Sequence, residues 1–186
     1  PNMTIMAPKN KWELSDMMKF AIRQNGPVAI RYPRGEAYTG LEEYRAPIEM
    51  GKAEVLEKGK EIAILAVGNM VRTAVQVTEN LRKKGYEPTL VNMRFVKPLD
   101  TELLDIIKED HSLIVTMEEN VKSGGFGEQV MTYYGSRMHG PAVRIVAIED
   151  QFVPHGSVED LMRQQQMDSD SVTERVLQWQ TKVKTK

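Results

Sequence analysis

Short apolar runs alternate with segments of helical periodicity along most of this chain, and this alternation constrains the fold more than any other feature. Five of the runs lie in the second part of the chain, at residues 53–56, 62–67, 89–93, 113–116 and 143–148. Several are almost continuously apolar, which is typical of strands buried on both faces of a parallel sheet. Strands that alternate with helices predict an α/β domain of three layers with a mostly parallel sheet.

The segments between these runs carry apolar residues at the spacing of a helix face. They predict helices around residues 71–78, 103–107, 127–134, 158–162 and 172–179. Gly85 is placed to end the first of these helices, and Asp100 is placed to cap the second.

The first 35 residues predict a smaller strand–helix–strand unit. Residues 3–7 and 28–32 form its strands, and Asn10 is a candidate N-cap with Glu13 as its capping-box partner. The helix presents one apolar face, made of Leu14, Met17, Met18, Ala21 and Ile22. Two strands and one helix are too few to bury a core, so this unit is expected to need a larger body.

Between the two parts, the chain has no strong period and contains Gly40, which favours a linker. The predicted division is therefore an incomplete first domain at 1–36, a linker at 37–50 and a second domain at 51–182. The chain starts at Pro1, without an initiator methionine and almost directly in an apolar run, from which a cut chain is expected.

Composition excludes several classes of function. The 25 basic and 26 acidic residues give a net charge of -1, so no basic excess favours nucleic acid or an anionic membrane as a partner. The absence of cysteine excludes disulfides, thiolate metal sites and cysteine nucleophiles, and it fits a reducing compartment such as the cytoplasm. No apolar run reaches the roughly 20 residues of a membrane helix.

The segment Arg31–Gly35 is the most informative candidate site. It follows a predicted strand, and ligands of α/β sheets collect at the carboxyl ends of strands. Strand alternation places Arg31 and Arg34 on different faces, so they are expected to have different roles. Pro33 fixes the backbone between them and Gly35 lets it turn. Such an arginine suits a phosphate or carboxylate, although a structural ion pair with a neighbouring carboxylate is the alternative.

Four further places have a structural interpretation beside the functional one. Gly68 and Asn69 lie in an ordinary strand-to-helix turn and do not form a dinucleotide motif. Glu118 and Glu119 are adjacent, so they point different ways and make a poor chelate. The glycine loop at 124–127 favours a tight turn with close approach of helix and strand. His155 lies in a predicted turn with no visible partner for catalysis.

At Arg31–Gly35 the chain resembles a known family, the 1-deoxy-D-xylulose-5-phosphate synthases, which are thiamine-diphosphate-dependent enzymes of the transketolase type. The resemblance covers nearly the whole chain, and its motifs stand in the family's order and at similar spacing. These motifs are at residues 31–35, 51–55, 94–100, 116–120, 124–127 and 152–157. Two places depart from the family pattern, Lys9–Asn10 and Ala147–Asp150.

The resemblance implies a fold, a reaction and one site. Residues 1–36 correspond to the end of a pyrimidine-binding domain, and residues 51–182 to a transketolase C-terminal domain. The family joins pyruvate to glyceraldehyde 3-phosphate with loss of carbon dioxide, uses thiamine diphosphate and Mg²⁺, works as a homodimer and serves isoprenoid, thiamine and pyridoxal biosynthesis. It implies that Arg34 binds the phosphate of glyceraldehyde 3-phosphate, with Arg31 and Tyr32 as supporting positions.

Much of the family's catalytic machinery has no counterpart in this sequence. The Gly-Asp-Gly motif that holds the diphosphate and magnesium is absent, and so are the glutamate that activates the cofactor and the acid–base histidines. No catalytic, cofactor-binding or metal-binding residue is therefore assigned, and the 186 residues alone are expected to be inactive. Two alternatives stay open: a non-catalytic docking domain like that of the pyruvate dehydrogenase beta subunit, and a free-standing small-ligand binder.

Overall fold

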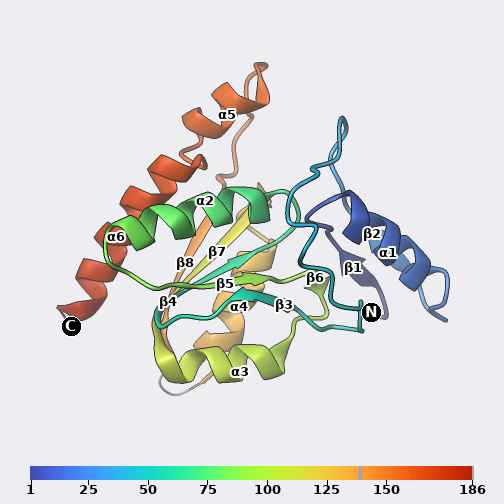
Figure 1. The fold of residues 1–186 in the computed structure, drawn as a ribbon, viewed down its shortest axis with the longest axis horizontal. Coiled ribbons are helices and arrows are strands. Elements are labelled where there is room, and N and C mark those ends of the chain that lie inside the picture. Colours follow the sequence, from blue (N-terminus) through green and yellow to red (C-terminus); the bar gives the residue numbers. More distant parts are fainter. Residues whose placement is uncertain (138–139, 186) are drawn as a thin grey trace.

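A five-stranded sheet forms the centre of the molecule (Figure 1). The computed structural model describes residues 1–137 and 140–185. The strands lie in the order β3-β5-β4-β7-β8, and all neighbours are parallel except β3 and β5. Their bounds are β3 (Glu54–Glu57), β4 (Glu61–Ala66), β5 (Thr89–Asn92), β7 (His111–Val121) and β8 (Ala142–Ile148). The predicted α/β fold with a mostly parallel sheet is confirmed.

Helices cover both faces of this sheet. One core lies beneath α2 (Met70–Lys83) and α6 (Ser169–Lys184), and the other beneath α3 (Thr101–Asp110) and α4 (Phe126–Gly135). Figure 1 shows these pairs on opposite sides of the strands, and the short helix α5 (Val158–Gln164) beyond them. The three predicted layers are therefore present, and all five predicted helices exist.

The predicted helix signals act largely as expected. Asp100 caps α3, because its side chain accepts a hydrogen bond from the backbone N–H of Leu103 at 3.1 Å. Gly85 follows α2 with a φ of +85°, the left-handed conformation that glycine adopts at low cost. One boundary differs, since α4 begins at Phe126 rather than at Gly127.

A second, three-stranded sheet contains the predicted strand–helix–strand unit. β1 (Thr4–Met6) and β2 (Val28–Ile30) pair in parallel on either side of α1 (Lys11–Ala21) in the sequence. The third strand is β6 (Phe95–Lys97), which pairs antiparallel with β1 and was not predicted. This strand belongs to the second part of the chain, so the unit gains part of the larger body that it was expected to need.

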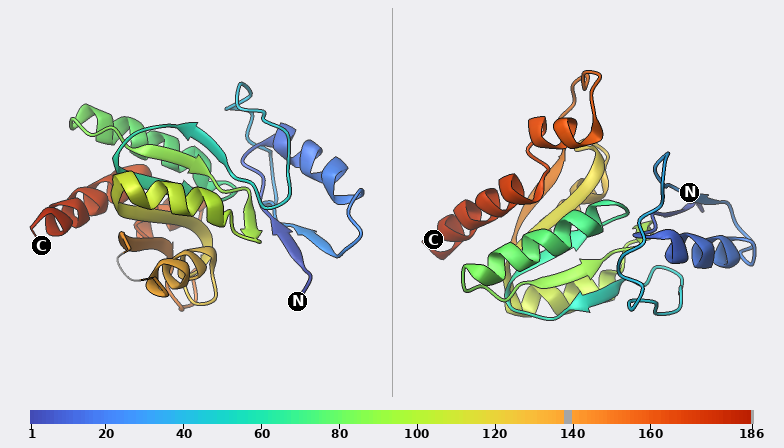
Figure 2. Two further views of the ribbon diagram at one scale, coloured as in Figure 1. Left: turned by 90° about the horizontal axis from the view of Figure 1, so that it is seen from below. Right: turned by 45° about the horizontal axis from the view of Figure 1, so that its top comes forward.

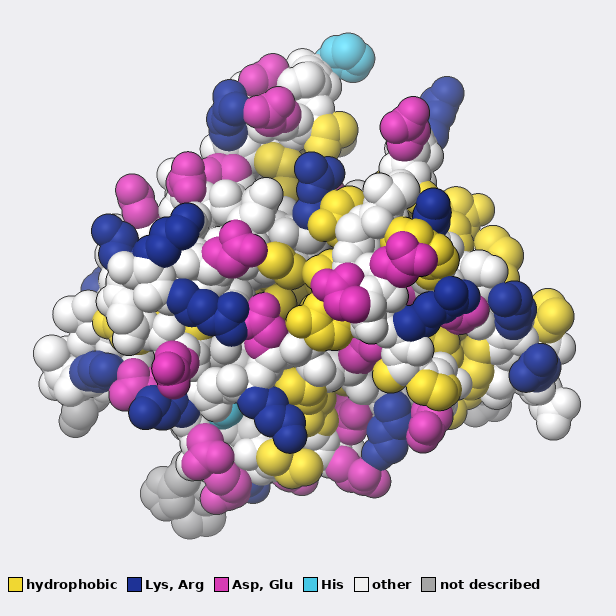
Figure 3. Space-filling view, viewed as in Figure 1, with side chains coloured by type: hydrophobic (Ala, Val, Ile, Leu, Met, Phe, Trp, Pro, Cys, Tyr) yellow, Lys and Arg dark blue, Asp and Glu magenta, His cyan; other side chains and the backbone are white. Residues whose placement is uncertain are grey.

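The predicted apolar face of α1 is only partly correct. Met17 is fully buried, but Met18 is 46% exposed and Ile22 is 84% exposed. The buried face of α1 contains Glu13 beside Met17, and the Glu13 carboxylate belongs to a buried cluster of charges. Figure 3 shows hydrophobic side chains gathered on the part of the surface that lies over this unit.

The buried charges form a network between the two parts of the chain. Lys9 bonds to Glu13 at 2.9 Å and to Glu54 at 2.7 Å. Arg94 bonds to the same two carboxylates, at 2.8 Å and 3.0 Å. The amide of Asn92 donates to both oxygens of Glu13. These five side chains, here called the buried charge network, are all at most 7% exposed.

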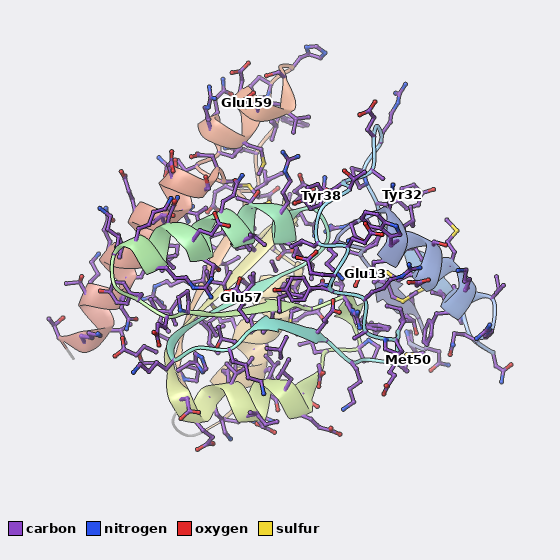
Figure 4. All side chains as sticks on the ribbon, viewed as in Figure 1. Glu13, Tyr32, Tyr38, Met50, Glu57 and Glu159 are labelled. Carbon is purple, nitrogen blue, oxygen red and sulfur yellow. The ribbon has the colours of Figure 1, made fainter. Side chains whose placement is uncertain are left out.

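The network carries equal numbers of opposite charges, which is the arrangement that makes burial of ions tolerable. Burial raises the pKa of Glu54, but the hydrogen bond from Lys9 and the charge of Arg94 outweigh burial and hold that pKa below its usual value. Figure 4 shows Glu13 between α1 and the strands of the five-stranded sheet. The network therefore joins α1 to β3 and to the end of β5.

The capping box predicted for α1 is half correct. Asn10 caps the helix by accepting from the backbone N–H of Glu13 at 2.9 Å. The Glu13 carboxylate accepts from the backbone N–H of Lys9 at 2.7 Å instead of that of Asn10. The reason is that the ion pairs with Lys9 and Arg94 hold the Glu13 carboxylate in the buried charge network.

The two ends of the described chain lie on opposite sides of the molecule in each of the views in Figure 2. Among the described residues, no helix is long and apolar enough to cross a membrane.

Candidate functional site

The segment Arg31–Gly35 leaves the three-stranded sheet at the carboxyl end of β2. The backbone N–H of Arg31 still donates to Met6 at 2.8 Å, so the segment is tied to β1 at its start. Gly35 has a φ of +117°, a conformation that side chains with a Cβ rarely adopt. The turn that Gly35 was predicted to allow is therefore present.

Arg34 lines a cavity of about 230 Å³. Tyr32 and Pro33 come to its wall from the same segment, Lys9 and Asn10 from the start of α1, and Asn69 from the start of α2. The ammonium group of Lys9 is already bonded to two carboxylates in the buried charge network. Of the two cationic side chains on this wall in the described residues, Arg34 is therefore the one free to bind an anion.

Arg31 lies in different surroundings from Arg34. It is absent from the wall of this cavity in the described part of the chain, and its charge acts on Glu119 at the far end of β7. Burial raises the pKa of Glu119, while the charge of Arg31 and a hydrogen bond from Asn69 partly oppose that rise. The different placement of the two arginines agrees with the alternation predicted for them.

A larger groove of about 580 Å³ adjoins the Arg34 cavity. Tyr38 and Asn69 line both, so they form the wall between them. The guanidinium carbon of Arg72 lies 5.1 Å from the centre of the Tyr38 ring, which holds that wall against α2. Figure 4 shows Tyr38 between the near end of α2 and α1.

The groove lies where the five-stranded sheet reverses its winding direction. From β4 the chain moves through α2 to β5 on one side, and it returns through α3 to β7 on the other side. Asn69 lies in the turn after β4 and Glu119 lies near the end of β7, at the carboxyl ends of these neighbouring parallel strands. Ligands of open α/β sheets bind at this kind of switch point.

Glu118 has a structural role that the sequence did not reveal. Its carboxylate is 1% exposed and accepts from the backbone N–H groups of Phe126 at 2.9 Å and Gly127 at 2.7 Å. It therefore caps α4 from the neighbouring strand. A Cβ on Gly125 would lie 2.6 Å from the Glu118 carboxylate, which confirms the close approach of helix and strand predicted for the glycine loop.

Replacing Glu118 by Gln is expected to lower the free energy of unfolding by about 2 kcal/mol, because an amide cannot accept from both buried N–H groups as well as a carboxylate can. Urea unfolding of this chain measures the change. The matched control is Glu174→Gln at an exposed site on α6, where a change below about 0.5 kcal/mol is expected. Equal losses in the two variants would show that the cap contributes nothing.

His155 belongs to an exposed segment between β8 and α5. All residues from 151 to 160 are exposed, and Phe152 is completely so. The structure thus brings His155 to neither the Arg34 cavity nor the adjoining groove, as far as the described residues show. In the same part of the chain, no three His, Asp or Glu side chains are grouped so that they could hold a metal ion.

Comparison with known proteins assigns the chain to a protein family. Residues 51–172 match the family model of the transketolase C-terminal domain, and the chain belongs to this family. The particular relatives are 1-deoxy-D-xylulose-5-phosphate synthases. The chain is 43% identical over 177 residues to the synthase of Lachnoclostridium phytofermentans and 40% identical over 177 residues to that of Clostridium tetani. Each match covers 95% of this chain and 28% of the relative.

Solved structures agree on the fold. A split-gene transketolase described as an inactive beta4 tetramer has a TM-score of 0.89 at 28% identity, over 97% of this chain and 59% of that chain. The transketolase of Campylobacter jejuni has a TM-score of 0.75 at 17% identity, over 96% of this chain and 26% of that chain. The relatives do not favour the alternative of a docking domain from another thiamine-diphosphate enzyme.

Proposed function

We propose that this chain is the C-terminal part of a 1-deoxy-D-xylulose-5-phosphate synthase and that it contributes the phosphate-binding arginine. The parent enzyme would condense pyruvate with glyceraldehyde 3-phosphate, releasing carbon dioxide, in the cytoplasm and as a homodimer. The identity to synthases over 95% of the chain supports this activity. We retain the division into residues 1–36, 37–50 and 51–182 as part of the proposal.

The observation that carries the proposal is the placement of Arg34. Arg34 is an exposed residue that lines a small cavity at the carboxyl end of β2, and no ion pair among the described residues involves it. The alternative, an arginine held by a neighbouring carboxylate, therefore lacks its partner in the described chain. Arginine is suited to phosphate because its planar fork can donate two parallel, charge-assisted hydrogen bonds. Arg31 and Tyr32 keep supporting roles in the proposal.

The residues of this chain do not fit thiamine diphosphate with magnesium. The sequence lacks the Gly-Asp-Gly motif, and the described residues contain no group that could hold a metal ion. We therefore derive no catalytic step from these residues and expect the isolated chain to show no synthase activity. The cofactor and Mg²⁺ would be bound by parts of the parent enzyme outside the sequence described.

The test is a titration of the chain with inorganic phosphate, in which binding is measured from the NMR chemical shifts of the backbone amides at residues 31–38. Arg34→Ala is expected to weaken binding at least about tenfold, because it removes charge-assisted hydrogen bonds and the charge that attracts the anion. Arg23→Ala, at an exposed position after α1, is the control and is expected to bind like the unchanged chain.

The same variant has a separate readout in the full-length enzyme. Arg34→Ala is expected to raise KM for glyceraldehyde 3-phosphate and to leave KM for pyruvate and for unphosphorylated glyceraldehyde unchanged. Phosphate binding that persists in Arg34→Ala would contradict the proposed role.

A further inference from the structure

The cavity beside Arg34 has a polar wall that comes from the five-stranded sheet. Asn69 lies in the turn between β4 and α2 and contributes to this wall, together with Tyr38. The other polar groups of the cavity come from residues 8–38, whereas Asn69 belongs to the second part of the chain. The sheet thus supplies a side chain to a site that the sequence places at the end of the first part.

The side chain of Asn69 has no role in its own helix. Although Asn69 is the N-cap residue of α2, it makes no side-chain capping bond, and the first backbone N–H groups of α2 donate to carbonyl oxygens of the preceding turn. Asn69 and Glu119 line the same larger groove, and hydrogen bonding by Asn69 opposes the rise that burial causes in the pKa of Glu119. An amide has two donors and an acceptor, so groups remain for a ligand in the cavity.

The cavity has a charged part at Arg34 and an uncharged polar part at Asn69. Arg34 supplies the charge available to an anion, since Lys9 is bonded to Glu13 and Glu54. Asn69 is uncharged, and it lies at the wall shared with the groove that Glu119 lines. A neutral group that both donates and accepts hydrogen bonds, such as a hydroxyl, suits this uncharged part.

We propose that Asn69 binds a hydroxyl group of the phosphorylated aldehyde whose phosphate binds Arg34, and that Glu119 positions the Asn69 amide. This inference rests on the proposed function of Arg34. The cavity of about 230 Å³ is smaller than the roughly 300–1,000 Å³ of sites for drug-sized ligands, as expected for so compact a substrate. It also gives the C-terminal domain a direct part in selecting the substrate.

The test compares two unreactive ligands, inorganic phosphate and glycerol 3-phosphate, which share the phosphate and differ in the hydroxyl groups. Their dissociation constants are measured by NMR titration of this chain. Glycerol 3-phosphate is expected to bind about fivefold more tightly, as one added hydrogen bond provides. Asn69→Ala is expected to reduce that ratio to about one while leaving the affinity for inorganic phosphate unchanged.

Two further variants distinguish the positioning of the Asn69 amide by Glu119 from a general loss of structure. Glu119→Leu is expected to lower the ratio, because the Asn69 amide loses the group that orients it, and a purely structural role would leave the ratio unchanged. Thr73→Ala lies four residues further along α2 and lines only the larger groove among the described cavities, so it is expected to keep the fivefold ratio.

The outcomes distinguish this inference from the proposal on which it rests. If Arg34→Ala abolishes binding of both ligands but the ratio is already one in the unchanged chain, or persists in Asn69→Ala, the role of Asn69 is wrong and that of Arg34 stands. If neither ligand binds, or Arg34→Ala binds both normally, both ideas fail. Support requires a ratio that depends on Asn69 and not on Thr73.

Discussion

Glu13→Gln is expected to lower the free energy of unfolding by about 3–5 kcal/mol, the largest effect of any single substitution considered for this chain. Glutamine has nearly the same shape, so the loss comes from charge rather than from packing. Lys9 and Arg94 would then share Glu54 as their one carboxylate, which leaves an uncompensated positive charge in a region that is at most 7% exposed. The amide of Asn92 would also lose the Glu13 carboxylate as an acceptor and keep only Glu54, at 3.4 Å.

Urea unfolding gives the size of this effect, and amide hydrogen exchange gives its location. Exchange is expected to speed up most in β1 and α1, because Glu13 fixes this unit to the five-stranded sheet. Glu79→Gln, on the exposed side of α2, is the control and should change stability by less than about 0.5 kcal/mol. A loss below about 1 kcal/mol in Glu13→Gln would mean that the buried charges contribute little.

The second large effect is expected for Gly127→Ala, with a loss of about 3 kcal/mol. A Cβ at this position would collide with the Thr116 hydroxyl and would lie 2.8 Å from a methyl carbon of Ile145. Both neighbours are buried residues on strands of the central sheet, so neither can move without disturbing the packing around it. The substitution would force α4 away from the sheet and disturb its cap on Glu118.

Gly135→Ala at the other end of α4 is the matched control. Among the described residues, no atom lies within 4 Å of where that Cβ would be, and alanine favours helix more than glycine does. This variant is expected to be as stable as the unchanged chain or more stable by up to about 1 kcal/mol. The two midpoints of thermal unfolding should therefore move in opposite directions, and a parallel decrease would contradict the explanation by close packing.

Local patterns were sufficient to predict most of the fold. The apolar runs of the central strands and the helical spacing between them predicted the three layers, because a strand buried on both faces leaves a strong signal in the sequence. The caps at Asp100 and Gly85 were also visible, since their effects act within a few residues. These features depend on neighbours in the sequence and not on contacts across the molecule.

The features that were missed or wrong all depend on distant contacts. β6 has three residues, and its pairing with β1 joins positions about ninety residues apart. The apolar spacing of α1 suggested a face that includes Met18 and Ile22, whereas the buried face includes Glu13. Nothing in the sequence near Glu13 shows that Lys9, Glu54 and Arg94 will meet around it. A carboxylate on a helix is normally solvated, so the local pattern indicated the wrong face.

The candidate site divides in the same way. The segment Arg31–Gly35 could be chosen from the sequence, because an arginine after a strand with a proline and a glycine beside it has a clear chemical use. Asn69 was interpreted as part of an ordinary turn, and Glu118 and Glu119 were left without roles. Strand alternation predicted that Glu118 and Glu119 point in different directions, but not that Glu118 caps α4 and Glu119 lines the groove. That Asn69 and Arg34 line one cavity depends on contacts between distant parts of the chain.

The strand β6 limits which segments of this protein can be replaced by the matching segments of a homologue. Recombination at residues 37–50 would join the first unit of one homologue to the sheet of another, but the donor's β1 would then have to pair with a foreign Phe95–Lys97. Hybrid proteins should therefore tolerate a junction in the linker only when residues 94–97 travel with the first unit. The linker marks the boundary between the two parts in the sequence, but the segment that must be exchanged with the first unit also includes β6.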